Sequence, residues 1–97
     1  MASEVDDGFY DRADAHIHLS NDQIRESVGR GKVSSSMMYA TARFNAWVSA
    51  CGFMSGTEMQ QAREDTLTYY CEQYRRMLEQ NLDEYINNHE QYMKVPK

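Results

Sequence analysis

The sequence contains one long stretch without helix breakers, because no glycine or proline occurs between Gly56 and Pro96. Within this stretch, apolar side chains recur every three or four residues, which is the spacing of one face of an α-helix. The pattern predicts a single helix over about residues 56–93. Its apolar side consists of Met59, Ala62, Leu67, Tyr70, Cys71, Tyr74, Met77, Leu78, Leu82, Tyr85 and Ile86.

The start and the weak points of this helix are also marked in the sequence. Ser55-Gly56-Thr57-Glu58 has the form of a capping box, with Met54 and Met59 placed to form a hydrophobic staple. Asparagine is a poor helix former, so Asn81 and the pair Asn87-Asn88 are the weakest positions. If the helix is not continuous, we expect it to break near Asn81.

A second helix is predicted over about residues 35–51. Ser34 would serve as its N-cap, and Gly52 follows its end. Side chains are apolar or small almost all round this helix, which is typical of the buried centre of a structure. The large ones are Met37, Ala40, Phe44, Trp47, Val48 and Cys51, and the small ones are Ala42, Ala46, Ser49 and Ala50.

A first helix is predicted over about residues 7–28. Asp6 or Asp7 would cap it, and Gly29 would end it because glycine adopts the left-handed conformation at low steric cost. No segment alternates apolar and polar residues as a strand does. The predicted fold is therefore all-α: a single domain, residues 1–97, of three helices in antiparallel hairpins. The apolar stripe of the first helix is Tyr10, Ala13, Ile17, Ile24 and Val28.

The lengths of the helices predict an overhang. If the second and third helices form an antiparallel hairpin about residues 52–57, the third helix passes the start of the second near Arg76. The remaining part, on the order of 25 Å long, would protrude with its apolar side uncovered. It could fold back at a break near Asn81, but we expect it to pack on a second copy and form a homodimer. The residues of this expected interface are Met77, Leu78, Leu82, Tyr85 and Ile86.

Composition narrows the class of protein. A chain of 97 residues is shorter than the roughly 150–250 residues of barrel and doubly wound enzymes. No apolar run approaches the ~20 residues that cross a bilayer. The first 25 residues are too acidic for a signal peptide, and two cysteines suit a reducing compartment. We expect a cytoplasmic protein without a membrane-spanning segment.

The charge of the chain argues against binding to nucleic acid. The 15 acidic and 10 basic side chains give a net charge of −5, which would repel phosphates. The tyrosines around residues 69–74, with Tyr85 and Tyr92, could stack on bases, but they lie among acidic neighbours. Residues 29–57 differ from both ends of the chain because they contain three basic residues and no acidic one.

Asp14-Ala15-His16-Ile17-His18 resembles the first metal-binding strand of amidohydrolases. We reject a metal site here because those enzymes take further ligands from other strands of a barrel, which this chain is too short to supply. On the predicted helix, His16 and His18 also point about 200° apart. No metal and no other cofactor is expected.

Gly29-Arg30-Gly31-Lys32-Val33-Ser34 resembles a phosphate-binding loop but departs from its pattern. Glu26 stands where the pattern needs its first glycine, and Val33 stands where it needs serine or threonine. Arg30 and Lys32, with the free N–H groups of Ser35 and Ser36 at the start of the second helix, leave only a local site that could attract an anion.

Arg43 is the only charged residue between Lys32 and Glu58. Because a buried arginine is normally paired, one interpretation is an internal salt bridge to Asp14, Asp22 or Asp65. The alternative is a binding cluster of Arg43, Tyr39 and Asn45 that faces a groove.

Three segments are similar to a bacterial family of short helical proteins known only as a domain of unknown function. They are Phe9-Tyr10-Asp11-Arg12-Ala13-Asp14, the stretch KVSSSMMYATARFNA at residues 32–46, and YRRMLEQNLDEY at residues 74–85. The resemblance covers about residues 9–93 and implies a bacterial, cytoplasmic protein without a known activity or cofactor. It also implies an apolar or aromatic residue at position 16 and often an acidic one at position 18, where this chain has histidines. The connector at residues 51–56 departs from the family in length and type.

No serine or cysteine is paired with a base, so we do not expect an enzyme. The sequence favours a non-enzymatic protein-protein interaction module, a regulator or adaptor that acts as a homo-oligomer. The alternative is a small-ligand or anion-binding protein that uses the Arg43, Tyr39 and Asn45 cluster or the loop with Arg30 and Lys32.

Overall fold

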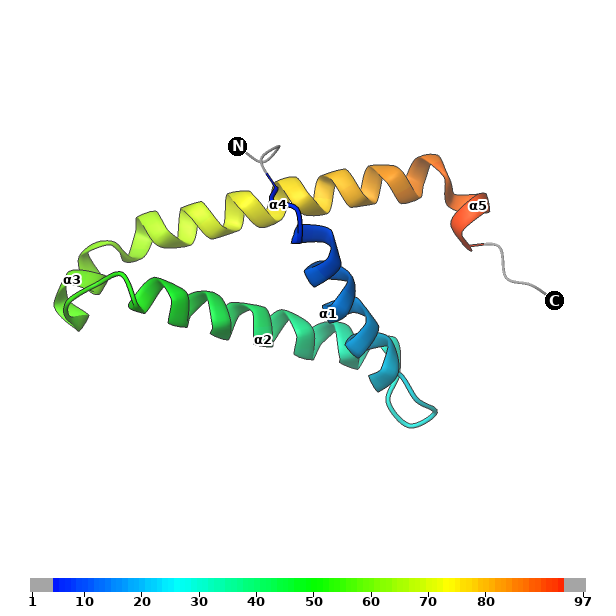
Figure 1. Cartoon of the computed structure of the whole chain (residues 1–97), viewed down its shortest axis with the longest axis horizontal. Helices are drawn as coiled ribbons and strands as arrows, with labels where there is room; N and C mark the ends of the chain where they lie inside the picture. Colours follow the sequence, from blue (N-terminus) through cyan, green and yellow to red (C-terminus); the bar gives the residue numbers. More distant parts are fainter. Residues whose placement is uncertain (1–4, 94–97) are drawn as a thin grey trace. The chain divides into compact units, whose positions relative to one another are not determined.

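The chain is helical throughout most of residues 5–93, which are the residues that the computed structural model describes (Figure 1). No strand occurs among these residues, and one isolated bridge pairs Arg25 with Val28. The predicted all-α class is therefore confirmed. The helices are α1 (Phe9–Gln23), α2 (Arg30–Ala50), α3 (Gly56–Gln61), α4 (Arg63–Asn87) and α5 (His89–Met93).

The chain divides into two units, Met1–Val48 and Ser49–Lys97, with the boundary near the end of α2. The first unit contains α1 and most of α2, and the second contains α3, α4 and α5. The expected hairpin of the second and third predicted helices spans this boundary. The three-helix arrangement and the single domain over residues 1–97 therefore stay predictions.

The start of α1 is fixed by a carboxylate that lies before the helix. Gly8 occupies the N-cap position without a side-chain cap, so neither Asp6 nor Asp7 is the cap itself. Asp6 instead accepts a hydrogen bond from the Gly8 backbone N–H (3.2 Å) and pairs with Arg12 at 2.8 Å. The predicted cap is therefore wrong, and Asp6 supports the start of the helix from two residues before the N-cap.

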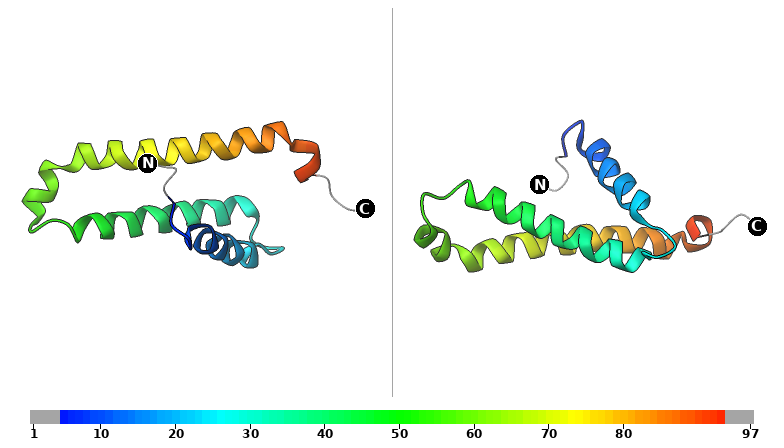
Figure 2. Two further views of the ribbon diagram at one scale, coloured as in Figure 1. Left: turned by 45° about the horizontal axis from the view of Figure 1, so that its top comes forward. Right: turned by 90° about the horizontal axis from the view of Figure 1, so that it is seen from below.

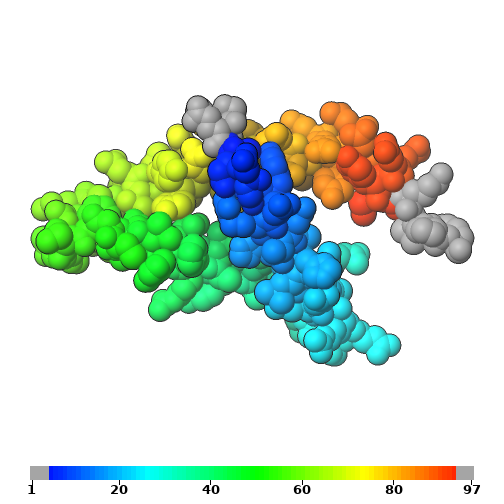
Figure 3. Space-filling view, in the orientation of Figure 1, coloured from blue at the N-terminus to red at the C-terminus, as the bar shows by residue number. Residues whose placement is uncertain are grey.

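The end of α1 differs from the prediction, since the helix stops at Gln23 and not at residue 28. Ile24 is extended, with φ −76° and ψ 120°. Arg25 and Val28 then exchange both backbone hydrogen bonds, at 2.9 and 3.1 Å, and close a tight turn. The turn forms the tip of the first unit (cyan in Figure 3). Ile24 and Val28 therefore lie outside the helix, although their apolar spacing fits a helical period.

α2 begins five residues earlier than predicted. The Gly29 carbonyl accepts hydrogen bonds from the backbone N–H groups of Lys32 (3.1 Å) and Val33 (3.3 Å), which closes the first turn. Ser34 therefore lies inside the helix and does not cap it. Ser36 also lies inside the helix and donates its hydroxyl to the carbonyls of Lys32 and Val33. The end at Ala50 is within one residue of the prediction.

Within the first unit, α1 meets α2 near the start of α2 (Figure 2). Val33 is 4% exposed and is the one buried residue in the described part of the chain. Next to it, the Ser20 hydroxyl donates to the sulfur of Met37 at 3.3 Å. α1 is shorter than α2, at 15 against 21 residues, so it leaves the far part of α2 uncovered.

Within the first unit, α1 does not bury the second helix in the way that its apolar surface predicts. Phe44 and Trp47 are 61% and 60% exposed, and their rings lie 5.6 Å apart on the surface of α2. Met38 and Val48 are exposed as well. Apolar residues all round a helix indicate that it is suited to burial. The pattern does not tell which other elements pack against the helix.

α3 begins with the predicted capping box. The Ser55 hydroxyl accepts a hydrogen bond from the Glu58 N–H at 3.1 Å, and the Glu58 carboxylate accepts one from the Met54 N–H at 2.6 Å. In the usual box the glutamate reaches the N–H of the capping residue, one position further on. The expected staple does not form, since Met54 is 93% exposed.

The predicted single helix over residues 56–93 is divided in two places. Ala62 separates α3 from α4, and its N–H bonds to the carbonyl of Met59 (3.1 Å), which tightens the last turn of α3. Asn88 separates α4 from α5, and its side-chain amide donates to the Glu84 carbonyl at 3.0 Å. The helix does not break at Asn81. The weakness of the Asn87-Asn88 pair was thus correctly predicted, and the break at Ala62 was not.

Candidate interaction surface

The residues of the expected oligomer interface lie together on one unbroken helix. α4 continues through Asn81, so these residues project from successive turns. All five are exposed, with 41% to 68% of their surface accessible. We call these residues the α4 face: Met77, Leu78, Leu82, Tyr85 and Ile86.

The apolar stripe continues toward the start of α4. Each helical residue turns by about 100°, which places Leu67, Tyr74, Leu78 and Tyr85 within ~20° of one line along the helix. Leu67 and Tyr74 are also exposed. The α4 face is therefore the larger part of a stripe that runs along most of the helix.

The other side of α4 is polar and acidic. Over its length the helix has six acidic and three basic residues. Glu72, Glu79 and Asp83 lie roughly 120–160° from the centre of the stripe. Arg75 and Glu79 form an exposed ion pair of 3.2 Å at the border of the stripe. Exposed pairs contribute about 0–1 kcal/mol, so this pair adds little to the stability of the helix.

α5 extends the apolar stripe beyond Asn88. The Tyr92 ring lies 5.1 Å from the ring of Tyr85, and its hydroxyl donates to a Glu84 carboxylate oxygen at 2.6 Å. The hydrogen bond to Glu84 raises the pKa of Tyr92 above its ordinary value. Tyr92 and Met93 are both exposed. They were not listed with the five residues of the expected interface, although Tyr92 follows Tyr85 by seven residues, the spacing of two helical turns.

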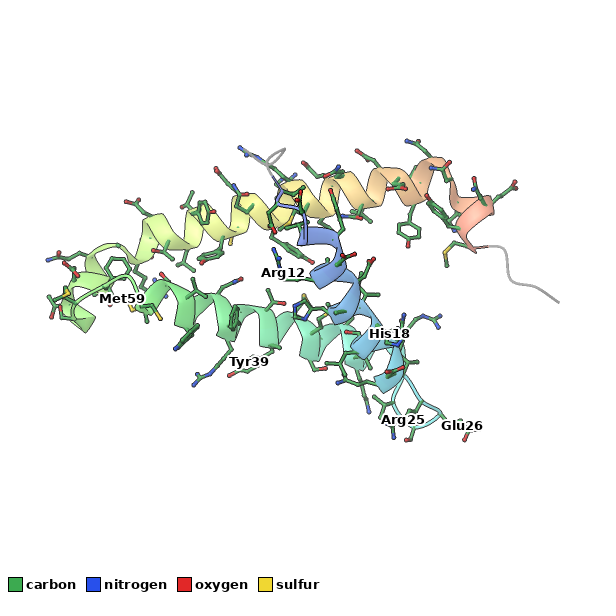
Figure 4. The ribbon with its side chains drawn as sticks, viewed as in Figure 1. Arg12, His18, Arg25, Glu26, Tyr39 and Met59 are labelled. Carbon is green, nitrogen blue, oxygen red and sulfur yellow. The ribbon has the colours of Figure 1, made fainter. Side chains whose placement is uncertain are left out.

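The predicted cluster on α2 is only partly assembled. Tyr39 and Arg43 are one turn apart and both exposed, and Tyr39 projects away from the ribbon (Figure 4). Asn45 lies about 160° round the helix from Arg43, so it faces elsewhere. Arg43 makes no ion pair within residues 5–93. The interpretation of Arg43 as a buried residue paired with Asp14 or Asp22 is therefore not met within the first unit, and a pair with Asp65 of the second unit stays a prediction.

The loop that was expected to attract an anion is part of a helix. Arg30 and Lys32 are exposed in the first turn of α2, where two residues of separation place them about 160° apart. Ser35 and Ser36 lie well inside α2, so their N–H groups are not the free groups at its start. The two basic side chains do not converge on one position.

The histidines of α1 likewise do not converge. His16 and His18 lie on different sides of the helix, and both are exposed. Within residues 5–93, no group of three or more histidine, cysteine, aspartate or glutamate side chains is arranged to hold a metal ion. Cys51 and Cys71 are free and exposed.

Comparison with known proteins assigns the chain to a family. A family model matches residues 9–86, which is most of the chain, and its description is protein of unknown function (DUF3144). The chain belongs to this family. The expected resemblance to a domain of unknown function is thus confirmed for this family over residues 9–86. Neither the curated proteins nor the solved structures contain a match to the chain.

The family match includes the α4 face and the exposed part of α2. Among the described residues, no helix combines the length and the apolar character that are needed to cross a bilayer.

Proposed function

We propose that this protein is a non-enzymatic protein-protein interaction module that acts as a homo-oligomer through the α4 face. The observation that carries the proposal is the exposure of five large apolar side chains on one side of one continuous helix. Contiguous apolar surface of this kind usually marks a site of association.

The shortage of buried side chains supports this proposal. In the described residues of the first unit Val33 alone is buried, and the helices of the second unit have no buried residue. Ordering a backbone costs roughly 1–2 kcal/mol per residue, and apolar burial is the main term that offsets it. Within residues 5–93, neither unit has a hydrophobic core of its own, so each gains stability when its apolar side is covered.

A second copy of the chain is the partner that we propose for the α4 face. With about half of each side chain uncovered, the five residues offer on the order of 500 Å² per copy. Leu67 and Tyr74 raise this area to roughly 650 Å², so a symmetric pair that covers all seven side chains would bury at most about 1,300 Å². That area lies within the roughly 1,200–2,000 Å² of specific interfaces. A two-fold dimer brings the same stripe from both copies together.

The exposed part of α2 is the surface that we propose for a protein partner. Tyr, Trp and Arg are the residue types that dominate binding energy at interfaces, and Tyr39, Arg43 and Trp47 are all exposed here. The module would thus associate through α4 and present α2, as a regulator or adaptor does. The two free cysteines suit the bacterial cytoplasm that we propose as its location.

Size-exclusion chromatography with light scattering tests the proposed association. We expect a dimer at concentrations well below ~100 µM, because an interface of this size is typical of specific complexes. A strict monomer at ~100 µM would contradict the proposal.

Binding of a small ligand or an anion remains the alternative prediction, through Arg43 and Tyr39 of the predicted cluster with Asn45 or through Arg30 and Lys32. A thermal-shift screen of nucleotides, sugar phosphates and carboxylates distinguishes the two functions. A specific ligand at 100 times its dissociation constant stabilises a protein by ~2.7 kcal/mol, which is readily detected. If none of these classes raises the melting temperature, the alternative fails.

A further inference from the structure

Asn81 is a polar residue in the middle of the apolar stripe of α4. At about 100° per residue it lies between the lines of Tyr74 and Met77, one turn from Leu78 and from Tyr85. Between Leu67 and Tyr85, every other residue within ~60° of the stripe's centre is apolar or aromatic. Any partner that covers the stripe therefore covers this amide as well.

The amide of Asn81 is only partly satisfied within the chain. Its Nδ2 donates to the Met77 carbonyl of the same helix at 2.7 Å. Its Oδ1 accepts no hydrogen bond from any residue between 5 and 93, and the side chain is exposed. When the stripe is covered, this oxygen loses water and needs a donor from the partner, because an unpaired buried polar group is costly.

We propose that Asn81 is a specificity-determining residue that sets the register of the α4 dimer by pairing with Asn81 of the second copy. The inference rests on the proposed self-association through the α4 face. On a two-fold axis the two amides meet, and the free N–H of one Nδ2 reaches the Oδ1 of the other. A shift by one turn places each amide against Leu78 or Tyr85 of the other copy and leaves it unpaired. A single buried asparagine fixes register in this way in coiled coils, and it reduces affinity.

The test replaces Asn81 by leucine and compares affinity and register with those of the wild-type chain. Sedimentation velocity and light scattering report the dissociation constant and the stoichiometry. A spin label at Gln80→Cys, on the polar side of α4, reports register in chains that also carry Cys51→Ser and Cys71→Ala. The matched control is Asn87→Leu, which makes the same exchange on the polar side of the helix.

The expected result for Asn81→Leu has two parts. The dissociation constant falls by at least about tenfold, because an apolar side chain replaces the amide in the interface. With Asn81 in place, we expect a single distance between the two spin labels. In Asn81→Leu we expect a broad distribution or several distances, because the dimer no longer has a polar pair that disfavours the shifted registers. Asn87→Leu changes neither measurement.

Three outcomes would overturn the inference. An unchanged dissociation constant in Asn81→Leu places residue 81 outside the interface. A weaker dimer shows that the amide supplies affinity and not register. A tighter dimer that retains one sharp distance shows that other residues set the register. Failure of the proposed function has a different signature, since the wild-type chain is then monomeric before any substitution is made.

Discussion

Replacing Ile86 by aspartate tests the α4 face at its most exposed side chain. Ile86 is 68% exposed and lies about 100° from the centre of the stripe, at its border, so a second copy that covers the stripe would remove about a third of it from water. Complete burial of such a side chain is worth roughly 1.5–3 kcal/mol, which gives about 0.5–1 kcal/mol here. A two-fold interface contains the residue twice, so the loss is about 1–2 kcal/mol, or roughly 5- to 30-fold in Kd.

The introduced carboxylate acts in the same direction. Its charge must either leave water without a partner or hold the two copies apart. We therefore expect Kd to rise by at least about tenfold in Ile86→Asp. Sedimentation velocity over a concentration series measures this change, and circular dichroism checks that the helix content is retained.

Asn87→Asp is the matched control for Ile86→Asp. It introduces the same charge one residue later, near the same end of α4, but on the polar side of the helix. Both substitutions meet the negative end of the helix dipole, so that effect cancels in the comparison. Equal weakening by both variants, or no weakening by Ile86→Asp, would show that the α4 face is not the interface.

Three further predictions concern the local structure. Ser55→Ala should destabilise the start of α3 by about 1 kcal/mol, which urea denaturation measures, and an unchanged midpoint would contradict the capping role. The bond from Arg12 lowers the pKa of Asp6, so this bond stabilises α1 above the ordinary carboxyl value of 3.8 and is lost as pH falls through the lowered pKa. An NMR pH titration of the Gly8 amide should follow that transition, and Asp6→Asn should abolish it. The Glu84 bond raises the pKa of Tyr92, so its stabilisation is complete below about 10 and is lost as pH rises through the raised pKa. An absorbance titration should show a late tyrosine that is missing in Tyr92→Phe, and a titration unchanged by that substitution would contradict the assignment.

Features of the fold that depend on a few neighbouring residues were predictable from sequence. The capping role of Ser55 and the break at Asn88 follow from the side chains at those positions and their adjacent backbone groups. The wrong prediction of the end of α1 also concerns a few neighbouring residues, but these act through their backbone groups and not through their side chains. Ile24 and Val28 fit a helical period, while the turn that replaces the helix is held by backbone groups of Arg25 and Val28, which sequence periodicity does not report.

The errors at Arg43 and Trp47 come from a property that is not local. Both residues were assigned to a buried helix because its surface is apolar all round, yet both are exposed. Burial depends on which elements cover a helix, and α1 covers only the first part of α2. The divergence of Asn45 from Arg43 could have been predicted, because their spacing of two residues places them on different sides of any helix.

The excess of acidic over basic residues on α4 has a consequence for the kinetics and the salt dependence of self-association. Two copies that approach through α4 carry like net charges, six acidic against three basic residues on each helix, while the contacting side chains are apolar. Salt screens repulsion between exposed charges over roughly 8–10 Å near physiological ionic strength. Association through this helix should therefore become faster and tighter as ionic strength rises, which is the opposite of the behaviour of an interface held by ion pairs.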